Sequence, residues 1–187
     1  MSAVLGTLQK LIKLFEGRKI PYMIIGGQAV LIHGEPRLTK DIDVTLGMDI
    51  TEMPLIVKVV KKSGLRVLPK STKVFVKQTM VLPVSDTQSG LRIDLIFSHT
   101  TYERGAIQRA IVVKINGQEV RFASVEDTII HKIFAGRPRD IEDVQSILKK
   151  QSAYDKKYIR HWLKEFSKVT SRDLVSEYND ILKGLKV

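Results

Sequence analysis

The stretch Asp41-Ile-Asp-Val-Thr-Leu46 alternates carboxylate and apolar side chains at its start, a pattern typical of a β-strand with one buried face. Side chains two positions apart on a strand point to the same face of the sheet. Asp41 and Asp43 are therefore expected to share one face, while Ile42 and Val44 point the opposite way into a core. This alternation predicts a sheet that carries a pair of carboxylates in its middle.

Two further features accompany this strand. Gly26-Gly27 follows a short apolar run and precedes Asp41 by thirteen intervening residues, and Asp94 is the lone carboxylate of a second strand-like run, residues 91–97. Like charges gathered on a sheet repel one another and lose part of their hydration, which costs free energy. Divalent cations with oxygen ligands commonly offset such a cost, so the sequence predicts a cation site.

The order Gly26-Gly27, then Asp41-Ile-Asp43, then Asp94 resembles the signature of the polymerase-beta-type nucleotidyltransferase superfamily. Residues 25–34, Ile-Gly-Gly-Gln-Ala-Val-Leu-Ile-His-Gly, together with Arg37, are similar to the branch that contains the AbiEii-like toxins and related small nucleotidyltransferases. The resemblance covers residues 20–150. It implies an α/β nucleotidyltransferase fold, with a small mixed β-sheet flanked by helices and a helical C-terminal part.

The resemblance also implies a reaction and the residues that perform it. Asp41, Asp43 and Asp94 would be catalytic and would hold Mg²⁺ or Mn²⁺, with two ions expected. Gly26 and Gly27 would hold the triphosphate of a nucleoside triphosphate, because glycines let backbone N–H groups approach a phosphate at a helix N-terminus. The enzyme would move a nucleoside monophosphate to a hydroxyl or phosphate acceptor and release pyrophosphate.

A second block, residues 124–143, resembles the Glu-Asp, Lys and Arg-x-Lys-Asp region of the same branch. It makes Lys132 and Arg139 candidate nucleotide-binding residues, with Arg139 where that branch often has Lys. Arg37, just before the aspartate pair, is a third candidate. The alternative for each cation is an ordinary solvated or ion-paired side chain, with Asp140 and Asp143 capping the next helix or pairing with the neighbouring arginines.

The composition fits one soluble domain with no disulfides. The chain has 187 residues, 43% of them hydrophobic, and no cysteine. No basic leader and no apolar run of membrane-spanning length occurs, so we expect a cytoplasmic protein without membrane contact. We expect residues 1–123 to form the catalytic core and residues 124–187 a helical region packed on it.

The net charge of +11 is compatible with a polyanionic partner such as a nucleotide or RNA. Residues 51–100 contain eight Lys or Arg and only three Asp or Glu. A lysine-rich surface that binds no polyanion would give the same composition, and charge alone does not choose between the two.

Apolar spacing and turn signals predict the remaining elements. Helices are expected at residues 3–17, 29–33, 51–62, 102–110, 139–149, 154–168 and 171–184, with another beginning after the N-cap Ser124. In the helix at 51–62, Leu55, Ile56, Val59 and Val60 should face inward. Strands are expected at 22–25, 74–76, 79–82, 111–115 and 119–122, the last two joined by a hairpin turn at Asn116-Gly117.

The acceptor is not identified by these residues. RNA, a protein or a small molecule all fit the superfamily, and the AbiEii-like resemblance favours RNA or a toxin role in a toxin–antitoxin pair. The alternative is a non-catalytic nucleotide- or RNA-binding module, or an antitoxin-like protein, with the same fold. The three retained aspartates argue against that alternative, because an acidic cluster is costly to keep without a cation.

Overall fold

The computed structural model describes residues 3–39, 41–98 and 100–185. One mixed sheet forms its centre, with the strands in the order β3-β4-β5-β2-β1-β7-β6. The strands are β1 (Tyr22–Ile25), β2 (Asp41–Leu46), β3 (Leu65–Val67), β4 (Val81–Asp86), β5 (Arg92–Phe97), β6 (Ile111–Ile115) and β7 (Gln118–Phe122). The α/β fold class expected from the sequence is confirmed.

Helices pack on this sheet and extend beyond one end of it. Those before β6 are α1 (Ala3–Glu16), α2 (Gly26–His33), the 3-10 turn η1 (Ile50–Glu52), α3 (Met53–Lys62), α4 (Thr72–Thr79) and α5 (Thr101–Arg109). Those after β7 are α6 (Val125–Ala135), α7 (Pro138–Lys150), α8 (Lys156–Ser167) and α9 (Leu174–Gly184). No helix of the described residues is both long enough and apolar enough to cross a membrane.

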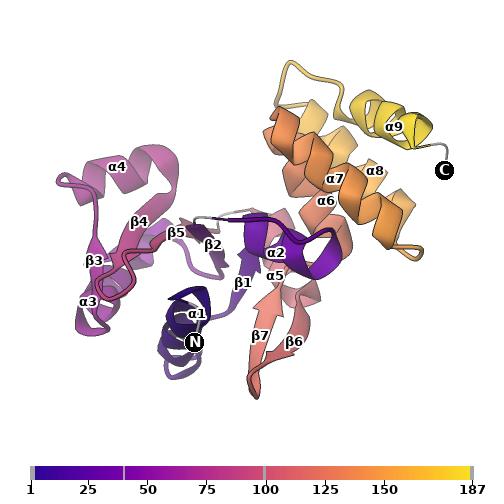
Figure 1. Ribbon diagram of the computed structural model, residues 1–187. Coiled ribbons are helices and arrows are strands. Elements are labelled where there is room, and N and C mark those ends of the chain that lie inside the picture. The colour runs from indigo at the N-terminus through magenta and orange to yellow at the C-terminus, as the bar shows by residue number, and fades with distance from the viewer. Residues whose placement is uncertain (1–2, 40, 99, 186–187) are drawn as a thin grey trace.

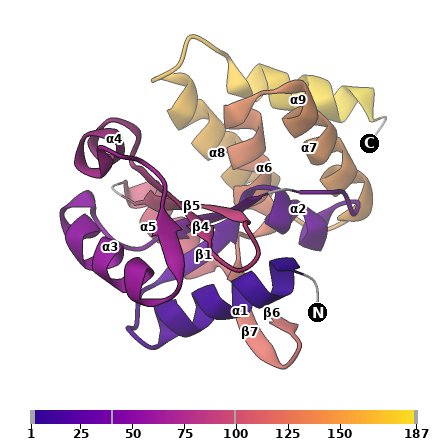
Figure 2. The ribbon, with the colours of Figure 1, turned by 60° about the vertical axis from the view of Figure 1, so that its left-hand side comes forward.

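The elements separate into two ends around β2 and β5. Figures 1 and 2 show α6–α9 gathered at one end of the molecule next to α2, and α3 and α4 at the other end beside β3 and β4. In both views α4 and α3 lie on opposite sides of β4. Strands β2 and β5 therefore run between two groups of helices.

The core lies on the sheet face that the aspartates avoid. Ile42 and Val44 of β2 and Ile93 and Leu95 of β5 are all fully buried. Strand β5 pairs with β2 on one side and with β4 on the other, which makes it a central strand. The alternation predicted for residues 41–46 is thus confirmed.

Local signals fixed several element ends as expected. Asn116 and Gly117 both have positive φ, 50° and 80°, as a two-residue hairpin turn requires. Ser124 caps α6 by accepting a hydrogen bond from the backbone N–H of Asp127 at 3.1 Å. Helix α7 begins at Pro138, where the missing N–H costs nothing.

The strand expected at residues 74–76 is wrong, because these residues belong to α4. Only Val76 is fully buried, whereas Val74 is 57% and Phe75 38% exposed. One buried side chain in this short segment fits a helix on the surface better than a strand within the sheet. The helix ends at Met80, which adopts a left-handed φ of 60°, so the next strand begins at Val81 rather than at Thr79.

Two smaller expectations also need correction. Leu55 was expected to face inward but is 49% exposed, while Ile56, Val59 and Val60 are buried as expected. The helix expected to start at residue 29 begins at Gly26 itself. Gly26-Gly27 is therefore the first turn of a helix rather than a separate loop.

The core predicts a stability effect at Ile93. Replacement of this fully buried residue by Ala should lower the free energy of unfolding by about 2–5 kcal/mol, because it removes apolar contacts from a central strand. Urea denaturation followed by circular dichroism measures this change. Leu38→Ala, at a side chain that is 85% exposed, serves as the control and should change stability by less than about 0.5 kcal/mol.

Candidate functional site

The three predicted carboxylates meet because β2 and β5 run parallel and in register. Asp43 lies directly opposite Asp94, and Asp41 lies opposite Arg92. Directly opposed residues of neighbouring strands point to the same face. Asp41, Asp43 and Asp94 are all only partly buried, on the sheet face away from the core.

The environment of Asp43 disfavours its charged form. Burial, with the added negative charges of Asp41 and Asp94, raises the pKa of Asp43 to about 6 from an ordinary value of 3.8. Lys132 and Arg137 act in the opposite direction but do not cancel the shift. Asp43 therefore lies in a position where an added cation would relieve both the repulsion and the lost hydration.

The N-terminus of α2 approaches this carboxylate closely. Gly26 has a φ of 63°, and a Cβ atom at this position would collide with the carboxylate of Asp43. A Cβ at Gly27 would instead lie 2.7 Å from Oγ1 of Thr39. At each glycine a Cβ atom would thus collide with a different neighbour. Only Gly26 of the two has a left-handed backbone conformation.

Residues 35–39, which we call the strap, cross the start of α2. The Oγ1 of Thr39 donates to the backbone oxygen of Asp41 at 3.1 Å and to its Oδ1 at 3.3 Å. The close packing of Thr39 on Gly27 holds the strap against the helix N-terminus. The strap therefore connects the candidate phosphate cradle to the aspartate strand.

An ion-pair network links the strap to the C-terminal helices. Arg37 binds Asp143 in a two-pronged pair, with Nε–Oδ1 and Nη2–Oδ2 distances of 2.6 and 2.7 Å. The Nζ of Lys132 lies 2.8 Å from both Asp143 and Asp140. Although burial raises the pKa of Asp143, the hydrogen bonds from Arg37 and Lys132 bring it below its ordinary value.

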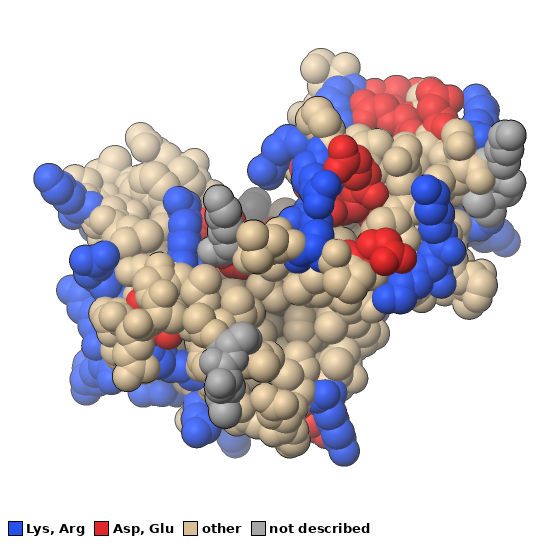
Figure 3. All heavy atoms as spheres, viewed as in Figure 1, with Lys and Arg blue, Asp and Glu red and all other residues tan. Residues whose placement is uncertain are grey.

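A cavity of about 520 Å³ lies where these groups converge. The predicted site residues that line it are Gly26, Gly27, Arg37, Asp41, Asp43, Lys132 and Arg139. Thr39, His131, Arg137 and Asp140 are among the other lining residues. Figure 3 shows the molecule hollowed between the two groups of helices, with Lys and Arg side chains at the rim.

Asp94 is the predicted residue that does not line this cavity. Its Oδ1 accepts a hydrogen bond from Nε of Arg92, two positions earlier on the same face, at 3.0 Å. Arg139 lines the cavity but its side chain is 59% exposed and pairs with Glu142 at 2.6 Å. The remaining predicted cation, Lys132, is buried and faces carboxylates on α7.

The sequence analysis did not identify Arg92 and His131 as contributors, nor the pairing of Asp143 with Arg37. Arg92 pairs with Asp94, and the i, i+2 spacing on a strand is a signal that could have revealed it. Asp143 pairs with Arg37, 106 positions away, which no local pattern indicates. His131 lines the cavity beside Lys132, and burial lowers its pKa.

The donor set fits a divalent cation, although the described residues form no complete metal site. Among the described residues, no three Asp, Glu, His or Cys side chains already converge as a metal site. Three carboxylates on adjacent strands nevertheless supply the hard oxygen ligands that Mg²⁺ prefers. The raised pKa of Asp43 shows that one of them lacks compensation in the protein alone.

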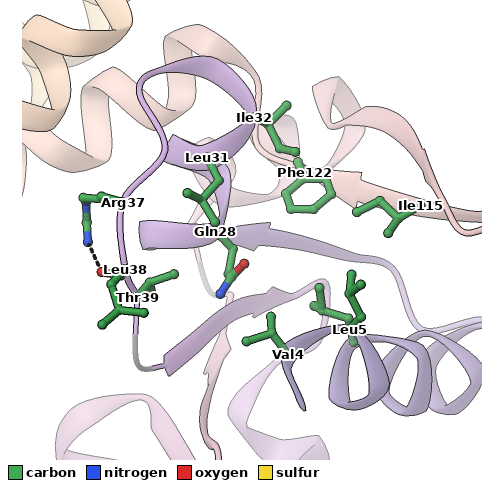
Figure 4. Close-up of a pocket in the computed structure, with 11 residues that line it drawn as sticks. Val4, Leu5, Gln28, Leu31, Ile32, Arg37, Leu38, Thr39, Ile115 and Phe122 are labelled. Atoms are coloured by element: carbon green, nitrogen blue, oxygen red, sulfur yellow. Dashed lines mark hydrogen bonds between the residues drawn. The ribbon is translucent and has the colours of Figure 1, made fainter. Parts of the chain in front are cut away.

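A second cavity, of about 390 Å³, lies on the other side of the strap. Figure 4 shows its mostly apolar lining, with Leu31 and Ile32 from α2, Val4 and Leu5 from α1, and Phe122 from β7. No carboxylate lines it. The candidate site is therefore the larger, charged cavity.

Comparison with protein families identifies a relationship over nearly the whole chain. A sequence model of the family described as "Nucleotidyltransferase of unknown function" (DUF6036) matches residues 3–185. No curated protein matches the sequence.

Solved structures share the fold at low sequence identity. ANT(2")-Ia in complex with adenylyl-2"-tobramycin is 17% identical with a TM-score of 0.62, over 89% of this chain and 98% of that chain. An antigenic nucleotidyltransferase-like protein from Paracoccidioides brasiliensis is 19% identical with a TM-score of 0.61, over 97% and 91%. The lincosamide antibiotic adenylyltransferase LnuA, lincomycin-bound, is 14% identical with a TM-score of 0.55, over 77% and 96%.

The raised pKa of Asp43 predicts a pH-dependent gain in Asp43→Asn. Below pH 3.8 the wild-type carboxyl is neutral in both folded and unfolded chains, so the two proteins should be equally stable. As the pH rises through about 6, the wild type alone loses stability, by up to about 3 kcal/mol. Urea unfolding in EDTA at pH 3 and pH 7.5 measures the difference. Asp180→Asn, at an exposed side chain of α9, is the control, and a gain independent of pH would contradict the assigned cause.

The contact between Gly26 and Asp43 predicts a second effect. Gly26→Ala should destabilise the protein by more than the roughly 1 kcal/mol that a positive φ alone costs, because the new methyl group displaces the carboxylate. Gly90→Ala is a matched control, since Gly90 has a φ of 73° and nothing within 4 Å of the added Cβ. Equal losses in the two variants, measured by urea denaturation, would rule out the predicted collision.

Proposed function

We propose that this chain, which belongs to the nucleotidyltransferase family DUF6036, transfers a nucleoside monophosphate from a nucleoside triphosphate to a hydroxyl or phosphate acceptor. The observation that carries the proposal is the in-register pairing of Asp43 with Asp94, beside Asp41 and the N-terminus of α2. Carboxylates on one side and free backbone N–H groups on the other are what a metal-bound triphosphate requires.

The triphosphate would lie at the start of α2. The first N–H groups of a helix have no intrahelical partner and carry partial positive charge. The absence of side chains at Gly26 and Gly27 leaves this backbone open to the cavity that both residues line. Arg137 and Arg139, which are exposed at the rim of the cavity, can add charge-assisted contacts to phosphate oxygens.

Lys132 supports the same assignment through its position. Its ammonium is buried between Asp140 and Asp143, and it lines the cavity. Arg37, which is paired with Asp143, lines the same cavity from the strap. These cations would favour a polyphosphate inside the cavity, and the two aspartates of α7 would keep them in place when it is empty.

Asp41, Asp43 and Asp94 would hold Mg²⁺ or Mn²⁺, two ions in the arrangement that the superfamily resemblance implies. Such ions, when bound, neutralise charge on the attacking and leaving oxygens of an in-line displacement. The carboxylates themselves would orient the triphosphate, since their fixed positions on β2 and β5 define one side of the site.

The reaction needs an acceptor next to Asp94. The acceptor oxygen would form a bond to the α-phosphorus while the bond from that phosphorus to its bridging oxygen breaks and pyrophosphate leaves. The acceptor's proton would pass to Asp94 or to water. Asp94 lies opposite Asp43, which lines the triphosphate cavity, and beside Arg92; from this position its carboxylate would meet the acceptor.

The proposal also includes the chemical class of the acceptor. Tobramycin is adenylylated in the complex with ANT(2")-Ia, and LnuA is seen with lincomycin bound. Tobramycin is an aminoglycoside and polycationic, whereas the net charge of this chain is +11, which disfavours such an acceptor. RNA, which the AbiEii-like resemblance favours together with a toxin role, is the acceptor we propose.

A non-catalytic nucleotide-binding module remains the second candidate. The observation in its favour is the ion pair between Arg92 and Asp94, because Asp94 could serve only to bind Arg92 and take no part in catalysis. The uncompensated environment of Asp43 argues for the enzyme, because a protein that binds no cation there has an avoidable cost.

Metal binding gives the first prediction of this proposal. Mg²⁺ or Mn²⁺ should raise the Tm of the wild type, since a ligand that binds only the folded state stabilises it. The Asp41→Asn/Asp43→Asn double variant should lose this shift although its Tm in EDTA equals or exceeds that of the wild type. Differential scanning fluorimetry measures both values, and an unchanged metal shift in the double variant would remove the metal assignment.

Asp94 separates the enzyme from the binding module. In Asp94→Asn, binding of a nucleoside triphosphate with Mg²⁺ should stay within about tenfold, roughly 1.4 kcal/mol. Transfer from each α-labelled nucleoside triphosphate to a cell extract, and pyrophosphate release, should fall about a hundredfold or more, because transition-state stabilisation is lost. Absence of transfer by the wild type with every nucleotide and acceptor pool would favour the module.

A further inference from the structure

Residues 53–85, which we call the basic lobe, contain seven Lys or Arg and no Asp or Glu. The lobe comprises α3, β3, α4 and nearly all of β4, and it lies at the end of the molecule opposite α6–α9. Its cations are Lys58, Lys61, Lys62, Arg66, Lys70, Lys73 and Lys77. Figure 3 shows Lys and Arg side chains spread over this end of the molecule.

These cations are not used to stabilise the fold. All seven side chains belong to exposed residues. None of them forms an ion pair with a carboxylate in residues 3–39, 41–98 and 100–185. Several cations elsewhere are paired with carboxylates, as with Arg37, Lys132 and Arg172. The lobe therefore keeps an uncompensated positive charge at its surface, which a polyanion could neutralise.

The lobe is continuous with the candidate catalytic face. Arg66 on β3 lies opposite Ser85 on β4, Ser85 lies opposite Arg92 on β5, and Arg92 lies opposite Asp41 on β2. Directly opposed residues share a face, so these four side chains form a row across the sheet, adjacent to the row that contains Asp94 and Asp43. The row leads from the basic lobe to the proposed catalytic carboxylates.

A separate cavity of about 340 Å³ lies along this row, beyond the triphosphate site. Arg66, Ser85, Thr87, Gly90 and Arg92 are among its lining residues. Asp86 and Leu68 complete the lining. The carboxylate of Asp86 forms an ion pair with Lys10 at 2.5 Å and accepts a hydrogen bond from the hydroxyl of Thr7. The cavity thus offers two guanidinium groups and two hydroxyl groups, and the carboxylate in its lining, Asp86, is already paired with Lys10.

From these observations we propose that the basic lobe docks a single-stranded nucleic acid, with one phosphate of the strand between Arg66 and Arg92 and the reacting end of the strand at Asp94. The inference rests on the proposed function for the role of the strand as acceptor, but not for its binding. Guanidinium groups match phosphate oxygens in a two-pronged geometry, and the lysines of α4 extend the positive surface along the strand.

Exposed apolar side chains favour a nucleic acid over a polyanion without bases. Leu68, Val74 and Phe75 are 39%, 57% and 38% exposed, and all three lie within the lobe among its lysines. Bases of a single strand gain free energy by stacking on aromatic or apolar side chains, which a simple polyphosphate cannot do. Cationic side chains interleaved with an exposed phenylalanine are the pattern of a single-strand binding surface.

Direct binding tests the docking surface without requiring catalysis. We would measure fluorescence anisotropy of labelled 12-nucleotide RNA and DNA of one sequence with the wild type and with the variant Lys70→Glu/Lys73→Glu/Lys77→Glu. We call it the α4 variant, because Lys73 and Lys77 lie in α4 and Lys70 lies just before it. The matched control, Lys58→Glu/Lys61→Glu/Lys62→Glu, makes the same charge change on α3, on the other side of β4.

The α4 variant should raise the Kd at least tenfold and lower the slope of log Kd against log salt by about 2, as expected for three lost phosphate contacts. The α3 control should raise the Kd less than threefold. Arg66→Gln should weaken the binding of both the RNA and the DNA. Phe75→Ala should also weaken the binding of both nucleic acids, without changing the affinity for inorganic polyphosphate. Equal weakening by the α3 and α4 variants, or no binding by the wild type, would overturn the proposal.

Transfer assays separate this inference from the proposed function. With an RNA acceptor, the α4 variant should raise KM at least tenfold while binding of nucleoside triphosphate and Mg²⁺ stays unchanged. Transfer only to a non-polyanionic acceptor, at the same rate in the α4 variant, would refute the role of the strand as acceptor but support the transferase. Strand binding at α4 without any transfer by the wild type would support the surface and refute the transferase.

Discussion

The parallel, in-register pairing of β2 with β5 is the constraint on which the rest of the site depends. It sets Asp43 opposite Asp94 and leaves the apolar residues of both strands in the core. A shift of one residue in this register would turn every side chain of one strand to the other face. The core and the carboxylate cluster are therefore specified by the same pairing, and neither can move without the other.

The free energy of that pairing includes an unfavourable electrostatic part. The pKa of Asp43 rises to about 6 because burial and two neighbouring aspartates oppose its charge. The adjoining cations relieve this only in part, and Lys132 and Arg37 are themselves paired with Asp140 and Asp143. The cations near the cluster thus form their ion pairs with carboxylates of α7 rather than with the three aspartates. The aspartates would therefore be available to bind a cation, and the cavity to bind phosphate.

The same division of charge extends across the molecule. On α6 and α7, Lys132 and Arg139 are paired with carboxylates, whereas the lobe of α3 and α4 leaves its cations exposed and without a carboxylate partner among the described residues. The aspartate cluster lies between these two ends (Figure 1). A triphosphate bound at α2 and a polyanionic acceptor bound at the lobe would approach that cluster from opposite sides, which is the arrangement that an in-line transfer needs.

The sequence by itself determined the elements whose signals are local. The alternation of residues 41–46, the Asn116-Gly117 turn and the Ser124 cap each depend on neighbours within a few positions, and all three are present. It also singled out Asp41, Asp43, Asp94 and the two glycines as one constellation, whose catalytic role stays a prediction. Only the tertiary structure decided that residues 74–76 are helical, that Gly26 rather than Gly27 approaches Asp43, and that Arg37 binds Asp143. The physical reason is distance along the chain: these outcomes depend on which residues become neighbours after folding, and strand propensity or a charged side chain carries no information about a partner 106 positions away.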